Sequence, residues 1–477
     1  MTKKISLMGA VLIIIGQTIG IGLFFKSHGI FESNDNNPIG IILSWLIGGI
    51  LTLFAGLSIT QLSRTKQEKY FINGFSQWIN TSCGKTLGDM SYFFRQILFF
   101  SSVTFMLSVF CLEAIFESFN YHGDIWIIFI TSFIVCLLIT YLNMVKRTVM
   151  VKLPHYIGAI KFVPMILCVV AAIIVACTGK GIDGLEYDNL FISKDVGKLS
   201  FSGVFNSIPA ILFAYNGYLV VGNLVNKIND PKKTVPRAMS IANSIIIGIY
   251  ITISITLIVN GATGGIILNI FGEGLGKTLM SIVLFIVSLG SVVLFNAVSF
   301  NTVDEAINFK QTIGSVLLNK LDNKKSGLGS LTLNYLLFVL YFIIFSIPSI
   351  ILDTDAIFDS SSNVGTFITF MLCGILFLGF LIKYFKKKIN IKIKFHNLAI
   401  IIFSGICVFI IAIYSIFYDF IAEICNDPYG KSVSGIFYQN QGINNILDGL
   451  VFWITIIFFI LLTLINQIWI NKKRHKI

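Results

Sequence analysis

The sequence predicts an all-α integral membrane protein. Of its 477 residues 55% are hydrophobic and only 12% are charged, a balance that would make a soluble protein aggregate. Runs of about 20 apolar residues, the length that crosses a bilayer as a helix, recur along the chain. We expect twelve transmembrane helices, at residues 6–26, 39–62, 87–117, 124–142, 151–177, 201–226, 238–260, 278–303, 331–352, 363–384, 398–418 and 447–470.

The basic residues predict the orientation of these spans. Lys and Arg number 35 against 23 Asp and Glu, and the net charge is +12. With a cytoplasmic N-terminus, most of the basic residues fall in inner loops, and most acidic residues fall outside, including Asp353, Asp355 and Asp359. We therefore expect a multi-pass protein of the cell membrane with both termini cytoplasmic. The positive charge then reflects insertion in the lipid bilayer, and no nucleic-acid partner is expected.

The cysteines and histidines indicate no metal site and no cofactor. Six of the eight cysteines lie within the expected spans, no CxxC pair occurs, and Cys425 in an outer loop has no obvious disulfide partner. The five histidines are scattered, and no Walker A pattern is present. These observations disfavour a membrane-embedded enzyme and the direct use of ATP.

The first span contains residues that weaken a membrane helix. It is too long for a removable signal peptide and lacks a small-residue cleavage site. Its segment GQTIGIG, residues 16–22, places three glycines and two polar residues at mid-depth. An interrupted helix is tolerated in hydrocarbon only where it is buried in protein or lines a cavity. Taken alone, the motif could also serve close packing between helices.

The sixth span repeats this anomaly with Asn206, Pro209, Asn216 and Gly217. Proline removes a helix hydrogen bond, and glycine lowers helix propensity by about 1 kcal/mol. Spans one and six lie five helices apart, so two five-helix halves would have opposite orientations. Paired interruptions in inverted halves are typical of a transporter binding site. We expect an inverted-repeat core over residues 1–385, followed by helices eleven and twelve and the C-terminus in residues 386–477.

A shorter helix is expected between spans two and three. In YFINGFSQWI, residues 70–79, aromatic and polar side chains alternate at roughly helical spacing. We interpret it as an amphipathic helix at the cytoplasmic membrane surface, with an ordinary cytoplasmic loop as the alternative.

Four segments resemble the amino acid permeases of the amino acid–polyamine–organocation superfamily, whose LeuT-like fold is an inverted five-helix repeat. They are IIGQTIGIGLF in span one, SWLIGGILTLFAGLSITQLSR in span two, HYIGAIKFVPMIL in span five, and ILFAYNGYLVVGNLVNKINDPKKTVPRAM from span six into the next loop. The chain departs from the family pattern at Gln61 and Lys227, where the family usually has Glu. It departs again at residues 301–315, where the family usually has arginines. These departures concern charge pairing at the inner gate more than substrate binding.

The resemblance implies an amino acid site at the two interruptions. A half-helix that starts near Gly20 presents free N–H groups and a positive dipole end, which suit a carboxylate. The carboxylate would bind the N–H groups around Gly20, Ile21 and Gly22. The ammonium would bind carbonyl groups near Thr18 and in the sixth span. The expected sixth-span site residues are Phe213, Ala214, Tyr215, Asn216 and Gly217. In the family, a bulky aromatic at the position of Phe213 covers the substrate from outside.

Lys161 is the candidate for energy coupling. It lies about ten residues, or roughly 15 Å, from the inner end of span five, near the bilayer midplane. A lysine at that depth is costly and is functional by default. In relatives, this lysine stands where sodium-coupled members of the fold hold sodium. Lys161 would then cycle a proton or act as a fixed cation; a structural lysine bonded to helix-end carbonyls is the alternative. Glu113 could reach water at the outer end of span three, and Arg95 could extend to the inner surface. A role in transport is the alternative for each of them.

The function implied is secondary active transport of amino acids by alternating access, coupled to protons or run as an exchange. A polyamine or other amine transporter of the same fold, and a sensor or channel without active transport, are the alternatives. No carboxylate stands out among the expected site residues, which favours neutral over cationic substrates.

Overall fold

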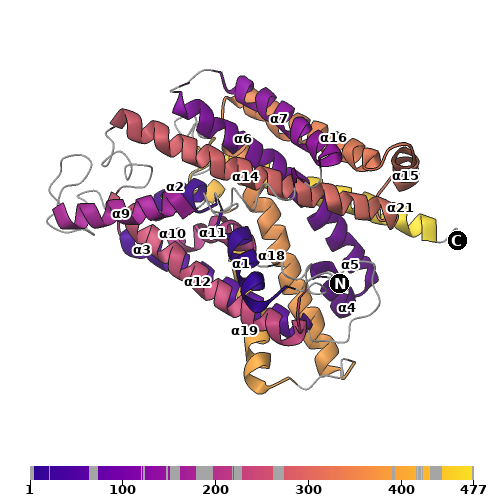
Figure 1. The fold of residues 1–477 in the computed structure, drawn as a ribbon. Helices are drawn as coiled ribbons and strands as arrows, with labels where there is room; N and C mark the ends of the chain where they lie inside the picture. The colour runs from indigo at the N-terminus through magenta and orange to yellow at the C-terminus, as the bar shows by residue number, and fades with distance from the viewer. Residues whose placement is uncertain are drawn as a thin grey trace.

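The computed structural model is helical throughout the part of the chain that it describes (Figure 1). The described residues are 5–20, 22–63, 74–119, 121, 124–146, 149–150, 162–178, 197–217, 219, 228–260, 273–388, 393–414, 416, 421, 423–429 and 443–474. No strand occurs among them, and an isolated parallel bridge joins Ile5 to Ile228. The all-α prediction is therefore confirmed for these residues.

Nine segments within the described residues are long and apolar enough to cross a membrane. They belong to α3 (Pro38–Ser63), α5 (Lys85–Tyr92) with η1 (Phe93–Phe99) and α6 (Phe100–Ser118), α7 (Ile125–Val145), α12 (Pro231–Asn260), α14 (Glu273–Asn308), α16 (Leu328–Tyr341) with η3 (Phe342–Ser346) and α17 (Ile347–Leu352), α18 (Ala356–Phe385), α19 (Phe395–Tyr414), and α21 (Asn445–Arg474). Each one overlaps a predicted span. They support a multi-pass membrane protein.

The other three predicted spans are the first, the fifth and the sixth. The first is divided into α1 (Leu7–Thr18) and α2 (Gly22–Ser33). The fifth contains α9 (Phe162–Thr178), and the sixth contains α10 (Phe201–Asn206) and α11 (Ile208–Tyr215). Parts of the fifth and sixth spans lie outside the described residues, so the total of twelve and the inverted relation of the halves stay predictions.

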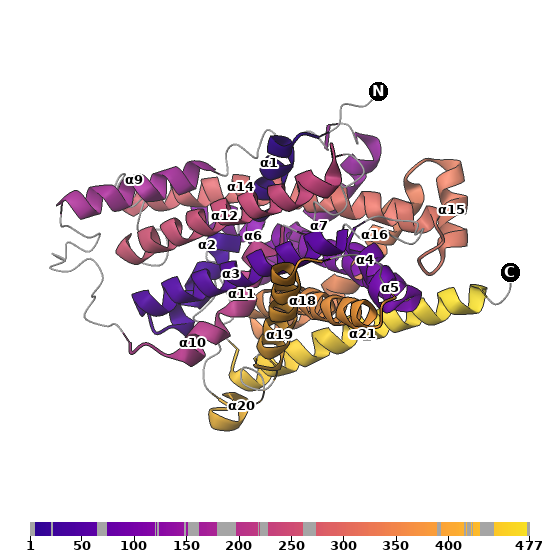
Figure 2. The same cartoon turned by 90° about the horizontal axis from the view of Figure 1, so that it is seen from below.

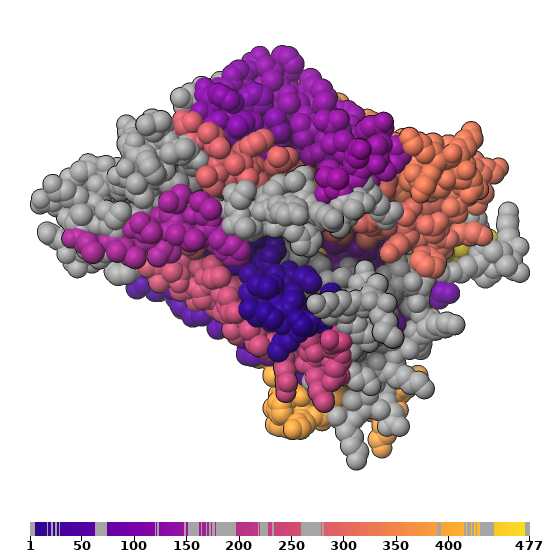
Figure 3. All heavy atoms as spheres, viewed as in Figure 1, coloured from indigo at the N-terminus to yellow at the C-terminus, as the bar shows by residue number. Residues whose placement is uncertain are grey.

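The helices pack into two hydrophobic clusters. One joins α1, α2, α3, α11 and α12, and α12 runs along both α3 and α1. The other joins η1, α6, α7, α14 and α16, with α14 packed along α6. α18 contributes to both clusters, and α19 and α21 lie against it (Figure 2). In the space-filling view, α1 reaches the surface beside α12 (Figure 3).

Apolar side chains on the outside of the helices follow helical spacing. On α7, exposed positions recur every three or four residues, as expected for one face of a helix. These positions are Trp126, Ile130, Ile134, Leu138 and Tyr141. Such a stripe suits contact with lipid tails.

The predicted short helix between spans two and three exists as α4 (Phe75–Cys83), and its residues are enclosed by protein. Its position at the cytoplasmic membrane surface stays a prediction. Every residue from Phe75 to Ser82 is buried, because α4 packs beneath α5 and α18. Close approach is possible because α18 has Gly379 there; a Cβ at this position would lie 2.3 Å from the Sγ of Cys83. Residues 70–73 lie outside the described part.

α15 (Ser315–Lys324) and α20 (Glu423–Asn426) complete the described helices. Neither contributes to the cavity described below.

Candidate functional site

The first span is interrupted where the sequence predicts. The side chain of Ser6 accepts a hydrogen bond from the Gly9 N–H and caps the start of α1. α1 ends at Thr18, and Ile19 is extended with ψ 108°. The helix resumes at Gly22 as α2. The chain therefore has a helix C-terminus and a helix N-terminus facing the same short interruption, each with backbone groups that lack intrahelical partners.

The sixth span contains a bend and an early helix end. α10 gives way to α11 at Ser207, and Pro209 lies in the first turn of α11, where its missing N–H leaves no helix hydrogen bond unmade. The α-helix ends at Tyr215 and tightens into a 3₁₀ turn at residues 216–217. Residues 220–227 lie outside the described part.

The two interruptions touch each other. A Cβ at Gly217 would lie 2.4 Å from the backbone N of Thr18 and 2.5 Å from its Cα. A Cβ at Gly22 would lie 3.1 Å from the Cα of Ala214. Glycine is required at position 217 because no side chain fits between the two backbones. The end of α1 and the end of α11 therefore meet at one place.

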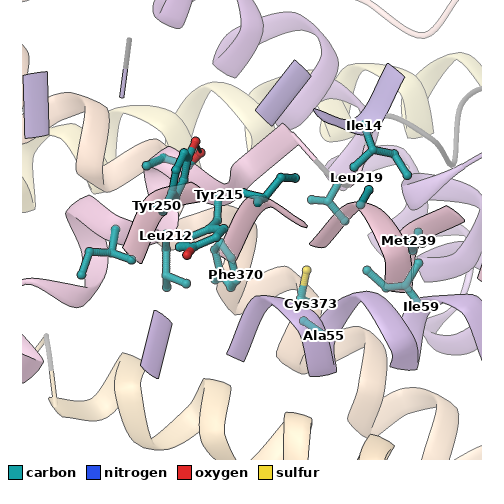
Figure 4. Packing of buried hydrophobic residues seen from close by; sticks show 14 of the residues in the cluster. Ile14, Ala55, Ile59, Leu212, Tyr215, Leu219, Met239, Tyr250, Phe370 and Cys373 are labelled. Carbon is teal, nitrogen blue, oxygen red and sulfur yellow. Dashed lines mark hydrogen bonds between the residues drawn. The ribbon is translucent and has the colours of Figure 1, made fainter. Parts of the chain in front are cut away.

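Tyr250 of α12 joins the two helix ends, although it is not among the site residues predicted from the sequence. Its hydroxyl lies 2.9 Å from the carbonyl oxygen of Thr18 and 3.0 Å from that of Ala214, in position to donate to either. Its ring packs against Trp45 of α3 at 5.2 Å and against Tyr215 at 4.8 Å between ring centroids. Figure 4 shows Tyr250 and Tyr215 side by side in the buried cluster. No motif marked Tyr250, because its role depends on contacts with two distant segments.

A cavity lies at this meeting point. It brings together seven of the nine predicted substrate-binding residues: Thr18, Gly20, Gly22, Phe213, Ala214, Asn216 and Gly217. η1 and α6 contribute Arg95, Phe99, Phe100, Val103 and Leu107, and α14 contributes Ser291, Leu294 and Phe295. No Asp or Glu is among the described lining residues.

Of the other two predicted binding residues, Tyr215 is not part of the described lining and Ile21 is not described. Tyr215 is buried behind the wall, where its hydroxyl donates to the carbonyl oxygen of Trp45 at 3.4 Å. Ile21 lies outside the described residues, as does Lys161, the candidate for coupling. Ligand binding by the predicted residues stays a prediction.

A buried ion pair lies behind the cavity wall, and it too was missed. Lys26 of α2, only 2% exposed, donates to the carboxylate of Asp359 and to the Oγ of Ser362 at 2.6 Å, both on α18. Its Nζ also lies 5.1 Å from the centre of the Phe213 ring. The sequence predicts an outer-loop position for Asp359, but α18 begins at Ala356, before the predicted start at 363. Lys26 ended the predicted first span, so its charge indicated only a boundary.

The chain matches the amino acid permease family over residues 9–476. It belongs to this family. The family is one of permeases rather than enzymes, as expected from the sequence.

Similar proteins cover part of this permease. It is 26% identical over 258 residues to the serine/threonine exchanger of Bacillus subtilis. The aligned segment covers 54% of this chain and 55% of that protein. It is 22% identical over 257 residues to the human large neutral amino acids transporter small subunit 2, and this segment covers 52% of this chain and 46% of the human protein. An uncharacterized protein of Mycoplasma pneumoniae is 25% identical over 291 residues, 54% of this chain and 51% of its own. The chain spans about half the length of the curated relatives that it matches.

Two charged residues of the third predicted span are buried inside the protein. Arg95 of η1 is 1% exposed, so its side chain is enclosed by protein and does not reach the surface of the molecule. Its guanidinium carbon lies 5.3 Å from the centre of the Phe75 ring and 5.4 Å from that of Phe100. Glu113 of α6 does not reach water either, because its side chain is 2% exposed. Neither of its carboxyl oxygens has a hydrogen-bond partner among the described residues of the permease.

Proposed function

We propose that this permease is a secondary active transporter of amino acids. The observation that carries the proposal is the meeting of two interrupted helices at a cavity lined by their ends. A zwitterion needs partners for a carboxylate and for an ammonium when it leaves water. The N-terminal turn of α2 supplies N–H groups and a positive dipole end for the carboxylate. The carbonyl groups at the ends of α1 and α11 accept from the ammonium.

The composition of the lining favours amino acids over polyamines. A substrate with two or more ammonium groups would call for carboxylates in the site. The described lining has none and contains a guanidinium, that of Arg95. Its other polar side chains are the hydroxyls of Thr18 and Ser291 and the amide of Asn216. Uncharged substrate side chains fit this environment. The relatives named for serine and threonine and for large neutral amino acids support the same class.

The transport cycle we propose is alternating access in the cell membrane, with both termini in the cytoplasm. The inverted repeat of residues 1–385 would present the site to each side in turn. Basic residues are concentrated in the loops that this orientation places inside.

Lys161 remains our candidate for coupling, through a cycled proton in symport or as a fixed cation in an exchanger. The relative named as an exchanger supports the second mode. Lys161→Ala is expected to reduce uptake into proteoliposomes and to flatten its dependence on pH. Undiminished and still pH-dependent uptake by the variant would contradict the role.

The decisive experiment has two stages. Thermal stabilisation of the purified permease is measured against the twenty amino acids and common polyamines, and the stabilising compound is then used for proteoliposome uptake. Saturable accumulation supports the transporter. Binding without flux would instead indicate a sensor, an ohmic leak would indicate a channel, and stabilisation by polyamines alone would indicate the amine transporter.

A further inference from the structure

The cavity has a buried cation at some distance from the helix breaks. Arg95 lines it, although its side chain is almost completely enclosed by protein. The aromatic faces of Phe75 and Phe100 flank its guanidinium and hold it by cation–π contacts. Arg95 also lies within the π-helical segment η1, and π-helical turns are frequent at functional sites.

Two hydrogen bonds fix how the third-span helices lie against α14. Near one end, the Sγ of Cys111 donates to the carbonyl oxygen of Phe285 at 3.7 Å. Near the other, the Oγ1 of Thr302 donates to the carbonyl oxygen of Gln96 at 2.8 Å. Residue numbers rise along α14 as they fall along α6 and η1, so the two run antiparallel and in register.

This register gives the depth of Arg95. Gly20 faces Ser291, since a Cβ on the glycine would lie 3.9 Å from the serine Oγ. Gln96, the neighbour of Arg95, is level with Thr302. From Ser291 to Thr302, α14 rises about 16 Å at 1.5 Å per residue. Along the axis of α14, the backbone of Arg95 therefore lies about 16 Å from the level of Gly20. The offset is toward the end of the bundle where η1 begins. Arg95 therefore reaches the cavity from a level of the bundle different from that of the two helix breaks.

We propose that Arg95 forms a second, inner station for the carboxylate of the transported amino acid, between the helix-break site and the cytoplasm. The inference rests on the proposed function and on the orientation that the basic residues predict. A guanidinium offers several N–H donors in a fixed plane that matches a carboxylate. Among the described lining residues, Phe99, Phe100 and Phe295 form an apolar part of the cavity wall, and Arg95 is the one charged side chain that could receive a carboxylate there.

The test compares transport from the two sides of the membrane. The permease is reconstituted into proteoliposomes of determined orientation, and the half-saturation concentration is measured on each side with the amino acid that stabilises it most. Arg95→Met removes the charge at similar length, and Arg95→Lys keeps it. Gln96→Met is the matched control, because Gln96 is buried in the same π-helical segment but does not line the cavity.

We expect Arg95→Met to raise the half-saturation concentration on the cytoplasmic side by roughly 10- to 100-fold, the range for a hydrogen bond to a charged group. The value on the outer side should change little, Arg95→Lys should recover part of the loss, and Gln96→Met should match the wild type. Equal changes on both sides, or none, would overturn the inner station. Failure of the wild type to transport any amino acid would count against the proposed function instead. A loss of folded protein in Arg95→Met is detected by gel filtration, and Arg95→Gln, which also removes the charge but keeps a polar side chain, then decides: a wild-type ratio of the two half-saturation values in Arg95→Gln would overturn the proposal.

Discussion

The hydroxyl of Tyr250 lies 2.9 Å from the carbonyl oxygen of Thr18, the last residue of α1, and the same hydroxyl lies 3.0 Å from the carbonyl oxygen of Ala214 in α11. A hydroxyl has one proton, so it donates to one carbonyl at a time. Tyr250 therefore links the two interrupted spans through the backbone groups that the interruptions leave exposed. Any movement that separates α1 from α11 must change this contact.

Tyr250→Phe should destabilise the protein and weaken substrate binding together. The change removes the hydroxyl from a fully buried position and leaves carbonyl groups without this donor, at a cost of about 1–3 kcal/mol in the free energy of unfolding. Denaturant titration of the purified protein measures the first effect, and thermal stabilisation by the substrate measures the second.

Tyr341→Phe provides the control for this variant. Tyr341 is also buried, and its hydroxyl donates to the carbonyl oxygen of Leu98 at 2.9 Å, but it does not line the cavity. It should show a similar loss of stability with unchanged substrate binding. Equal binding losses in both variants would mean that Tyr250 acts on overall stability alone.

Gly217→Ala should disrupt the meeting point of the two spans. The added methyl group would overlap the backbone of Thr18 at 2.4–2.5 Å, and backbone atoms cannot move aside as a flexible side chain can. We expect a lower unfolding temperature and a loss of transport. Gly248→Ala on α12 is the control, because nothing lies within 4 Å of its Cβ position. That substitution should stabilise the helix by about 0.5–1 kcal/mol. Normal transport by Gly217→Ala would show that the spans can separate there without loss of function.

Most of the helical architecture and the position of the first break could be predicted from the sequence, because both depend on local properties. Apolar runs of bilayer length mark helices, and Gly20 and Gly22 mark a place where a helix is weak. The sequence could not predict what the exposed carbonyl groups contact. Tyr250 is separated from Thr18 by 232 residues, and a tyrosine within an apolar span carries no sign of such a partner.

The burial of the charged residues could not be predicted from the sequence for a related reason. Lys26 and Asp359 each stand near the end of an apolar run, where charges normally mark the membrane surface. In the structure each is buried and paired with the other across 333 residues, and pairing offsets part of the cost of burying the two charges. Only the fold reveals this contact. The sequence allows Arg95 to extend to the inner surface or to take part in transport, and in the structure its side chain is buried against the rings of Phe75 and Phe100.

The charges of Lys26 and Asp359 should contribute to the stability of the protein through their pairing, and neither charge should be required once the other is removed. Removal of one partner leaves an uncompensated buried charge, which typically costs 3–5 kcal/mol. Lys26→Met and Asp359→Asn should each lower the free energy of unfolding by about that amount. The double variant Lys26→Met/Asp359→Asn should recover a large part of the loss, because it leaves no buried charge at either position.

The measurement is a double-mutant cycle by denaturant titration, compared with the exposed pair of Lys233 and Asp230, whose nitrogen and oxygen atoms lie 3.6 Å apart. Solvent screens that pair, so its coupling energy should lie within about 1 kcal/mol.

The cycle is also informative for transport, since Lys26 contacts the ring of Phe213 in the cavity wall. If the double variant regains stability but not transport, the ion pair acts on the cavity wall as well as on folding. Strictly additive losses in the cycle would show that the two charges do not depend on each other, and would contradict the pairing.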